Sequence, residues 1–317
     1  MKEKPQVTRG LVLGLEHWIT DWPERARTYG LTTLALHAPP SRVVDFTGSE
    51  VGEKLIAGCK ANDIQLEFEL HAMGELLPRR LFETSPELFR LDETGQRTAK
   101  GNLCATNEEA VALVCANAVK LARRLRPTTH RFFFWPDDGP GWCHCEQCGT
   151  LSDSDQALLV ENAMLRALRD QVDPQAQLAH IAYHNTLQAP QQITPEEGVF
   201  LEFAPFHRKT DLPLTADVSV QREQLEALQA NLAVFGVSQA QVLDYWLDVS
   251  MYSRWKRPAV VLPWREDVLL ADLELYASLG VRHVTSFAVY VDTEYLAMYG
   301  EPPLSTYGCH LQRYVSG

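Results

Sequence analysis

Eight short apolar runs, separated by polar turns and helical segments, divide this chain of 317 residues. The runs lie at residues 11–15, 32–36, 64–70, 131–135, 178–183, 199–203, 241–247 and 283–289. Each has the length of a β-strand, and none contains an internal proline, which a central strand excludes. Strands that alternate with helices lie parallel, because each helix carries the chain back to the start of the sheet. Eight such units predict a closed (β/α)8 barrel, the TIM barrel fold, in a single domain over residues 1–317.

Signals for the intervening helices agree with this fold. The pattern TNEE at 106–109 is a capping box that opens a helix ending near residue 124. Residues 152–155 cap the next helix, and two later helices are expected to stop at Gly236 and Gly280.

An open, doubly wound sheet is the alternative arrangement of parallel strands. It usually has a glycine-rich phosphate loop directly after the first strand. In this chain Glu16, His17 and Trp18 follow the first strand, and no G-x-G-x-x-G pattern occurs. We therefore predict the closed barrel.

Two connections depart from the helical pattern. A long insertion follows the third run, over residues 73–105, and its sequence predicts a hairpin that turns at Gly95. Long loops after barrel strands usually shape the substrate site, so we expect the insertion to border it. Between the fifth and sixth runs we expect a proline-containing loop, residues 188–198, and a missing or very short helix.

The net charge indicates which partners to expect, and the cysteine content indicates which cellular compartment to expect. The formal net charge is −12 and no run of Lys and Arg is longer than two, so we predict neither a nucleic-acid partner nor a membrane surface. The sequence begins MKEKP and leads into a strand, unlike a signal peptide. Seven cysteines, three of them within six residues, favour a reduced compartment. We expect a cytoplasmic protein, and the oligomeric state stays open.

Polar side chains gather where the predicted strands end, the side of a barrel on which catalytic residues lie. In strand order they are Glu16 and His17; His37; Glu69 and His71; Asp137 and Asp138; Tyr183, His184 and Asn185; Glu202, His207 and Arg208; Asp244, Tyr245, Trp246 and Asp248; and Tyr290 and Asp292. Five of the ten histidines belong to this set. We therefore expect a polar barrel mouth that binds a ligand.

These side chains suit the hydrolysis of a glycosidic bond. That reaction needs a protonated carboxylic acid and a second group, a carboxylate or the substrate's acetamide, to stabilise the oxocarbenium-like centre. We expect Asp137, Glu202 and Asp244 to include the acid and the stabilising group. Since Asp137 and Asp138 are adjacent, at most one of them is expected to point into the site. The other residues of the set, except Glu69 and Arg208, are expected to bind substrate.

Aromatic residues add possible stacking surfaces for sugar rings. Trp142, Tyr245 and Trp246 are the candidates. For Trp246, packing between the barrel and its helices is at least as good an expectation.

Three cysteines follow the two aspartates in the segment WCHCEQC at 142–148. Cys143, Cys145 and Cys148 supply three thiolates to a structural zinc in one interpretation, with His144, Cys104 or a distant residue as the fourth ligand. In the other interpretation they are free, buried thiols. Disulfides are disfavoured because Cys-x-Cys pairs close strained rings. A redox role is disfavoured because no Lys or Arg lies close in sequence.

An ordered set of motifs resembles a family of bacterial barrel proteins labelled as a domain of unknown function. The motifs are RGL at 9–11, His71 followed by ELLP at 75–78, PELF at 86–89, GQR at 95–97, NLCATN at 102–107, PDD at 136–138, WCHCEQC at 142–148, AY at 182–183 and FAP at 203–205. The resemblance extends to about residue 210, and the cysteine segment is its most specific part.

The resemblance implies a (β/α)8 barrel related to glycoside hydrolases. That family is related to α-glucuronidases and hexosaminidases and includes endo-β-N-acetylglucosaminidases, so the resemblance implies a glycan substrate containing N-acetylhexosamine. Its members usually carry an N-terminal α/β domain, whereas we expect this chain to be little more than the barrel. The segment TSFA at 285–288 also lacks the Glu-Gly expected at the eighth strand.

Three functions stay open at this point. The first is a glycosidase that requires no cofactor. The second is a barrel that binds carbohydrate without cleaving it, which the missing Glu at the eighth strand suggests. The third is a metal-dependent hydrolase or isomerase using His17, His71 and His184, although the His-x-His pair that barrel amidohydrolases carry on strand one is missing.

Overall fold

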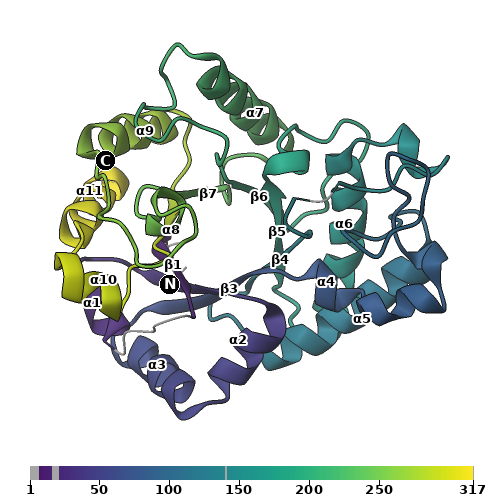
Figure 1. Ribbon diagram of the computed structural model, residues 1–317, viewed down its shortest axis with the longest axis horizontal. Helices are drawn as coiled ribbons and strands as arrows, with labels where there is room; N and C mark the ends of the chain where they lie inside the picture. The colour runs from purple at the N-terminus through teal and green to yellow at the C-terminus, as the bar shows by residue number, and fades with distance from the viewer. Residues whose placement is uncertain (1–6, 16–20, 140, 317) are drawn as a thin grey trace.

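Eight parallel strands close into a barrel in the order of the sequence (Figure 1). The structure is a computed structural model that describes residues 7–15, 21–139 and 141–316. The strands are β1 (Arg9–Gly14), β2 (Thr33–His37), β3 (Gln65–His71), β4 (Arg131–Trp135), β5 (Gln177–Ala182), β6 (Val199–Phe203), β7 (Gln241–Asp244) and β8 (His283–Phe287). Pairing of β1 with β8 closes the barrel, with Val12 opposite Phe287. The predicted (β/α)8 fold and all eight predicted strands are confirmed.

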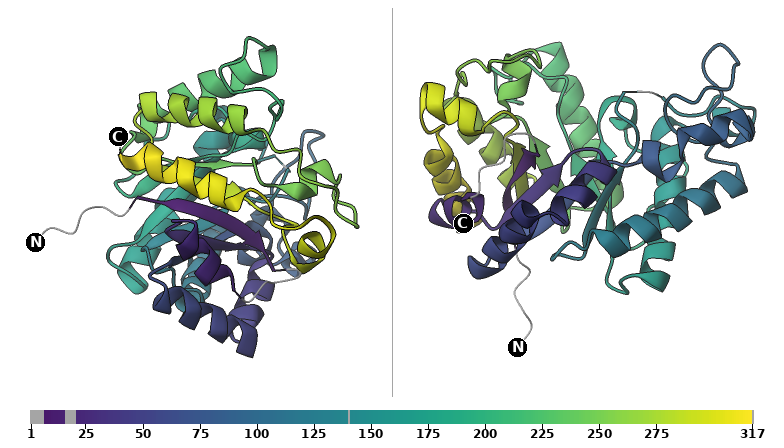
Figure 2. Two further views of the ribbon diagram at one scale, coloured as in Figure 1. Left: turned by 90° about the vertical axis from the view of Figure 1, so that its left-hand side faces the viewer. Right: turned by 60° about the horizontal axis from the view of Figure 1, so that its bottom comes forward.

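Helices surround the strands as an outer layer (Figure 2). The α-helices are α1 (Trp22–Thr28), α2 (Pro40–Thr47), α3 (Glu50–Ala61), α4 (Met73–Leu76), α5 (Glu108–Arg124), α6 (Asp153–Gln171), α7 (Ser219–Phe235), α8 (Val249–Tyr252), α9 (Glu266–Ser278), α10 (Thr293–Tyr299) and α11 (Leu304–Ser316). Short 3-10 helices lie at η1 (Arg79–Glu83), η2 (Pro86–Leu88), η3 (Cys148–Thr150) and η4 (His184–Thr186). As predicted, β5 and β6 are joined without an α-helix. No helix in the described part of the chain is long and apolar enough to cross a membrane.

The helix ends follow local sequence signals. The predicted cap at the start of α6 is confirmed and is a capping box, since the Ser152 hydroxyl accepts from the backbone N–H of Asp155 while the Asp155 carboxylate accepts from the backbone N–H of Ser152. At α5 the cap is Asn107, one residue later than the TNEE pattern predicts. Gly236 and Gly280 follow α7 and α9 with φ of 75° and 83°, as predicted for helix-ending glycines.

The barrel interior divides into an aromatic layer near the mouth and a polar layer below it. In the polar layer the buried guanidinium of Arg131 donates to Gln241 Oε1 over 2.7 Å and lies 4.1 Å from the centre of the Phe200 ring. Gln241 Nε2 in turn donates to Glu202 Oε1 over 3.0 Å. Glu67 and Glu69 are also fully buried here. This network fills the barrel below the site.

The insertion after β3 lies beside α5 and α6, on the opposite side of the barrel from α10 and α11 (Figure 1). Its predicted hairpin is confirmed, because Leu91 and Arg97 form an antiparallel bridge around Gly95, whose φ is 79°. The insertion also contacts the loop that follows β4, where the backbone N–H of His144 donates to Leu91 O over 2.8 Å.

Candidate active site

A cavity of about 220 Å³ opens at the carboxyl ends of the strands. Seven of the rings that line it contact one another in a closed circuit, with centroid separations from 5.1 to 6.1 Å. In order around the mouth these are His71, Trp135, His37, Phe287, Tyr245, Phe206 and Tyr183. We call this set the mouth aromatics. The walls of the cavity are therefore mostly aromatic, and the carboxyl groups of Asp138 and Asp248 also line it.

A second hollow, of about 420 Å³, adjoins the mouth cavity. The two share His37, His71 and Val289, and the second is otherwise lined by the ends of β1 and β2 and the start of α4. The barrel mouth thus has two adjoining hollows.

Asp138 is the exposed carboxylate of the mouth cavity. It follows β4, and the phenol of Tyr183 donates to its Oδ1 over 3.0 Å. Burial, and then the nearby charge of Asp138, raise the pKa of Tyr183. The phenol therefore keeps its proton and acts as a fixed donor that orients the Asp138 carboxylate.

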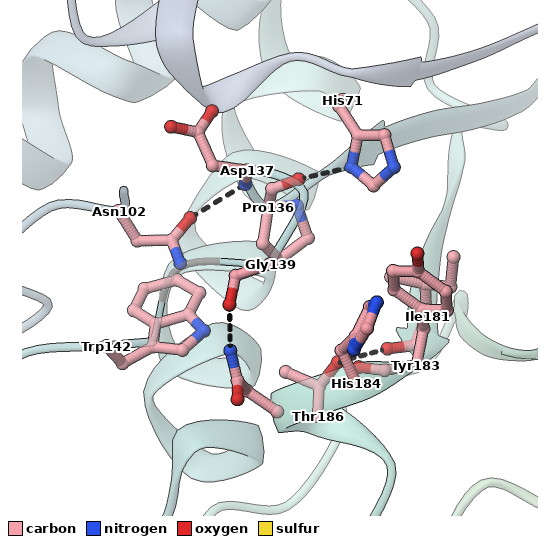
Figure 3. Close-up of a pocket in the computed structure, with 11 residues that line it drawn as sticks. His71, Asn102, Pro136, Asp137, Gly139, Trp142, Ile181, Tyr183, His184 and Thr186 are labelled. Atoms are coloured by element: carbon pink, nitrogen blue, oxygen red, sulfur yellow. Dashed lines mark hydrogen bonds between the residues drawn. The ribbon is translucent and has the colours of Figure 1, made fainter. Parts of the chain in front are cut away.

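Asp137 turns the other way (Figure 3). Its carboxylate pairs with Arg79 of the insertion and points away from His71 and Tyr183. Its backbone N–H donates to Asn102 Oδ1 over 2.9 Å. Burial raises the pKa of Asp137, against the opposing effect of the Arg79 charge. The two adjacent aspartates thus point in different directions, and it is Asp138, not Asp137, that lines the mouth cavity.

Asp248 is the second carboxyl group that lines the mouth cavity, and it is only 5% exposed. Its Oδ1 accepts from the backbone N–H of Ser250 over 2.9 Å and from the Ser250 hydroxyl over 2.6 Å, which caps α8. Burial raises the pKa of Asp248 to about 6, although these hydrogen bonds oppose the shift. A carboxyl group with such a pKa can donate a proton in mildly acidic solution.

Two histidines are held by backbone carbonyls of neighbouring strands and loops. His37 Nδ1 lies 2.7 Å from Glu69 O, and His71 Nδ1 lies 2.6 Å from Pro136 O. Since a carbonyl oxygen only accepts, each Nδ1 carries the hydrogen. Burial, and then the neighbouring His71, lower the pKa of His37 to about 4. His37 is therefore neutral near pH 7, and its Nε2 is a hydrogen-bond acceptor.

The loops after β5 and β6 meet at the side of the mouth. His207 Nε2 lies 2.7 Å from His184 Nδ1, and burial followed by the His207 charge lowers the pKa of His184. Asn185 Nδ2 donates to Gly139 O over 2.7 Å and so ties the β5 loop to the β4 loop. Asn185 thus supports the loop that carries Asp138, while the two histidines join the β5 loop to the β6 loop.

Sequence reasoning missed Trp255, which lines the mouth cavity and is 62% exposed. An exposed indole at the edge of a cavity offers a flat apolar face to a ligand. The signal for it was present, because Trp255 stands in a short polar stretch between two predicted elements. The mouth aromatics Phe206 and Phe287 were missed as well.

Comparison with known families now identifies the chain. A family model described as a domain of unknown function (DUF4838) matches residues 47–299. The chain belongs to this family. The match extends well beyond residue 210, to which the sequence motifs reach. None of the curated proteins matches the chain.

Solved structures with a fold like that of this DUF4838 chain include several glycoside hydrolases. The catalytic domain of a β-amylase from Paenibacillus polymyxa matches with a TM-score of 0.57 at 11% identity, over 98% of this chain and 99% of that one. A tri-modular GH5 endo-β-1,4-glucanase from Bacillus licheniformis matches with a TM-score of 0.58 at 9% identity, over 98% of this chain and 59% of that one. A GH20 module of the pneumococcal exo-β-D-N-acetylglucosaminidase matches with a TM-score of 0.50 at 9% identity, covering 98% and 84%. The DUF4838 barrel therefore shares the TIM barrel fold of these glycoside hydrolases.

Two residues predicted to bind or act in the DUF4838 mouth lie instead against α9. Asp244 Oδ2 is 3.1 Å from Arg208 Nη1 and accepts from the Tyr276 hydroxyl over 3.0 Å. Trp246 Nε1 donates to Asp272 over 3.0 Å. The structure corrects their predicted position, because alternation along β7 and its extension turns both side chains out of the barrel. They hold the barrel to its helical layer.

Glu202 is enclosed beneath the mouth. Trp135 Nε1 donates to its Oε2 over 2.7 Å, and the side chain is fully buried. Burial raises the pKa of Glu202 to about 8, against the lowering effects of that hydrogen bond and of Arg131. Trp135 lines the mouth cavity, whereas Glu202 does not.

The remaining predicted residues lie at the edges of the site or outside it. Trp142 is 1% exposed and packs within the β4 loop, so its ring offers no free stacking face. Asp292 caps α10 and pairs with Arg257, whose guanidinium lies 4.0 Å from the centre of the Tyr290 ring. The predicted residues Glu16 and His17 lie outside the described residues.

Proposed function

We propose that this barrel hydrolyses glycosidic bonds and that Asp138 and Asp248 are its two working carboxyl groups. The observation that carries the proposal is that both line one cavity at the barrel mouth, in contrasting surroundings. Asp138 is exposed and held by a phenol, whereas Asp248 is buried with a raised pKa of about 6. Two carboxyl groups in different environments are what general acid catalysis of glycoside cleavage requires.

Each carboxyl group has a role that follows from its surroundings. Asp248 is the group that keeps a proton in mildly acidic solution, so it protonates the leaving oxygen. Asp138, oriented by Tyr183, faces the positive charge that develops on the sugar ring or orients the substrate's own acetamide. Asp137 supports the loop through Arg79. No metal or cofactor is needed for these steps.

The mouth suits a carbohydrate ligand. The indole of Trp255 and the rings of Tyr245 and Phe206 offer apolar faces to sugar rings. His37 Nε2 accepts hydrogen bonds from hydroxyl groups. The two adjoining hollows have room for more than one sugar, which favours a glycan over a small glycoside. A substrate containing N-acetylhexosamine agrees with the sequence motifs and with the fold shared with the GH20 module.

Carbohydrate binding without cleavage is the second candidate. The observation that favours it is at β8, which contributes Phe287 to the mouth cavity and ends without a carboxyl group. A third candidate, a metal-dependent hydrolase, draws no support from the described mouth histidines, since the groups of possible metal ligands found among the described residues contain cysteines alone.

A substrate screen separates these functions. The purified chain is assayed with nitrophenyl glycosides and with N-glycan oligosaccharides, with product release followed by chromatography. We expect turnover that Asp248→Asn and Asp138→Asn each lower by about 100-fold or more, while the surface control Asp217→Asn keeps it. Binding of an oligosaccharide without product over days would instead identify a binding barrel. Turnover that survives both substitutions would remove these two carboxyl groups from the mechanism.

A further inference from the structure

Four cysteines converge at the outer side of the β4 loop, away from the mouth. Cys104 comes from the end of the insertion, and Cys143, Cys145 and Cys148 come from the loop that follows β4. Their four Sγ atoms all lie within 4.8 Å of one another. Cys104 is thus the fourth member that spacing alone left open. The side chain of His144 turns toward Glu93 instead, with 3.6 Å between Nε2 and Oε1.

The sulfur separations fit a metal better than a disulfide. Cys104 Sγ lies 3.7 Å from Cys145 Sγ and 3.8 Å from Cys148 Sγ. A tetrahedral zinc with Zn–S bonds of about 2.3 Å places its sulfurs about 3.8 Å apart. A disulfide would need about 2.05 Å. The cluster therefore already has the dimensions of a four-thiolate site.

Hydrogen-bond donors surround the sulfurs. The backbone N–H of Leu91 donates to Cys143 Sγ over 3.3 Å, and Arg97 Nη1 lies 3.8 Å from the same atom. The Thr106 hydroxyl lies 3.2 Å from Cys148 Sγ. Such donors offset the negative charge of metal-bound thiolates and orient them. Arg97 supplies the positive charge that no residue close to the three cysteines in sequence supplies.

A buried glutamine fixes the backbone of the cysteine loop. Gln156 of α6 accepts from the N–H of Cys143 over 3.0 Å and donates to the carbonyls of Cys143 and Cys148 over 3.2 and 3.3 Å. It is 2% exposed. The loop is therefore held in the ligating conformation by the helix behind it.

We propose that Cys104, Cys143, Cys145 and Cys148 bind one structural zinc ion. Four thiolates leave no open coordination position, which is the property of a structural site and not of a catalytic one. The ion would join the insertion to the β4 loop and so replace a covalent cross-link in this helix-poor part of the chain. The proposal is independent of the proposed glycosidase activity, because it rests on a cluster outside the mouth.

Hydrogen bonds also connect the cysteine cluster to the loop at the mouth. Asn102, two residues before Cys104, accepts from the N–H of Asp137 and donates to Gly141 O over 3.3 Å. Anchoring Cys104 therefore helps to position the loop that carries Asp138. Cys145 is partly exposed, and it borders a surface hollow together with Cys104, Arg97 and Thr106. A metal ion or a chelator can reach the cluster from that side.

Metal analysis of the purified full chain tests the proposal. We expect about one zinc per chain, and a sulfur-only shell at about 2.3 Å in X-ray absorption spectra. Cys104→Ser and Cys145→Ser should each lower the zinc content and the temperature of unfolding. Cys115→Ser is the control, because Cys115 is a free cysteine of α5 outside the cluster, and it should keep both values.

A second measurement uses only the wild-type chain, so it tests the proposal even if the cysteine variants fail to fold. Cobalt(II) replacing zinc in the wild-type chain should give the visible absorption bands of a tetrahedral four-thiolate site. Less than about a fifth of a zinc per chain after dialysis against zinc under reducing conditions would overturn the proposal. So would iron in place of zinc, or nitrogen and oxygen ligands in the absorption spectra.

Discussion

Tyr183 donates its phenolic hydrogen to Asp138 Oδ1 over 3.0 Å, and this bond joins the loop after β5 to the loop after β4. Both residues line the mouth cavity, so the bond fixes the one exposed carboxylate there that the described residues provide. A neighbouring contact, from Asn185 to Gly139, braces the same pair of loops. The Asp138 carboxylate is therefore held in one orientation although it is exposed.

Replacing Tyr183 by Phe tests the importance of that orientation. A hydrogen bond to a charged group contributes about 1.5–3 kcal/mol, so we expect kcat to fall by about 10- to 100-fold, with little change in unfolding temperature. Steady-state kinetics on the substrate found in the screen measures the effect. Tyr299→Phe, which removes a hydroxyl that donates to Ala259 O, is the control. An unchanged kcat in Tyr183→Phe would show that Asp138 needs no positioning.

The raised pKa of Asp248 predicts the pH dependence of activity. Because Asp248 must be protonated to act as an acid, kcat/KM should fall as pH rises above about 6, by about tenfold per pH unit. Asp248→Asn should remove this decline along with most of the activity. The pH profile of kcat/KM measures both. A profile that stays flat from about pH 5 to 8 would assign the acid to another residue.

The barrel could be predicted because its signal repeats. Each strand is buried by helices on one side and by the barrel interior on the other, so most of the strands appear as short, largely apolar runs. The helix cap at Ser152 and the helix-ending glycines at 236 and 280 could be predicted because their causes lie within a few residues. Such local signals gave the fold and the edge at which the site lies.

Side-chain direction could not be predicted as well. Asp244 and Asp248 are close in sequence, yet one packs against α9 and the other lines the mouth, since β7 ends at Asp244 and the chain turns there. Cys104 joins the cluster from 39 residues before Cys143 only because the insertion folds back onto the β4 loop. Long-range contacts of this kind leave no local pattern in a sequence.

The raised pKa of the buried Glu202 predicts that the free energy of unfolding depends on pH. Its pKa rises from 4.5 in the unfolded chain to about 8 in the fold. Between these values the folded protein keeps a proton that the unfolded chain has released. The residue's contribution to stability therefore falls by up to about 1.4 kcal/mol per pH unit as pH rises through that range. Glu202→Gln does not titrate, so its unfolding free energy relative to wild type should improve from about pH 5 to about pH 8.

Chemical denaturation at several pH values measures that difference. Glu226→Gln, an exposed position on α7, is the control and should track the wild type at every pH. A constant difference between Glu202→Gln and wild type would mean that Glu202 is already ionised in the fold.

Asp244 is expected to be needed for stability and not for chemistry. Asp244→Asn leaves the buried Arg208 with one carboxylate, Asp272, at 2.8 Å, and should lower the unfolding free energy by about 3 kcal/mol. The kcat of the folded fraction should stay close to that of wild type. Denaturation curves and activity per folded molecule measure the two effects. A loss of kcat of about 100-fold or more with normal stability would return Asp244 to the list of catalytic groups.

Substitution of Trp255 tests substrate binding apart from the chemical step. This residue lines the mouth cavity, yet its side chain is 62% exposed. A sugar ring stacked on its indole would gain binding energy in the ground state and the transition state alike. Removal of such uniform binding raises KM and leaves kcat unchanged. We therefore expect Trp255→Ala to raise KM by about 10-fold and Trp255→Phe to raise KM by a smaller factor. Addition of ligand should also change the tryptophan fluorescence of the wild type more than that of either variant. Val261→Ala, at another exposed apolar position, should leave KM as it is. If Trp255→Ala instead lowers kcat at constant KM, the indole acts in the transition state and the substrate lies deeper in the mouth than stacking at the rim requires.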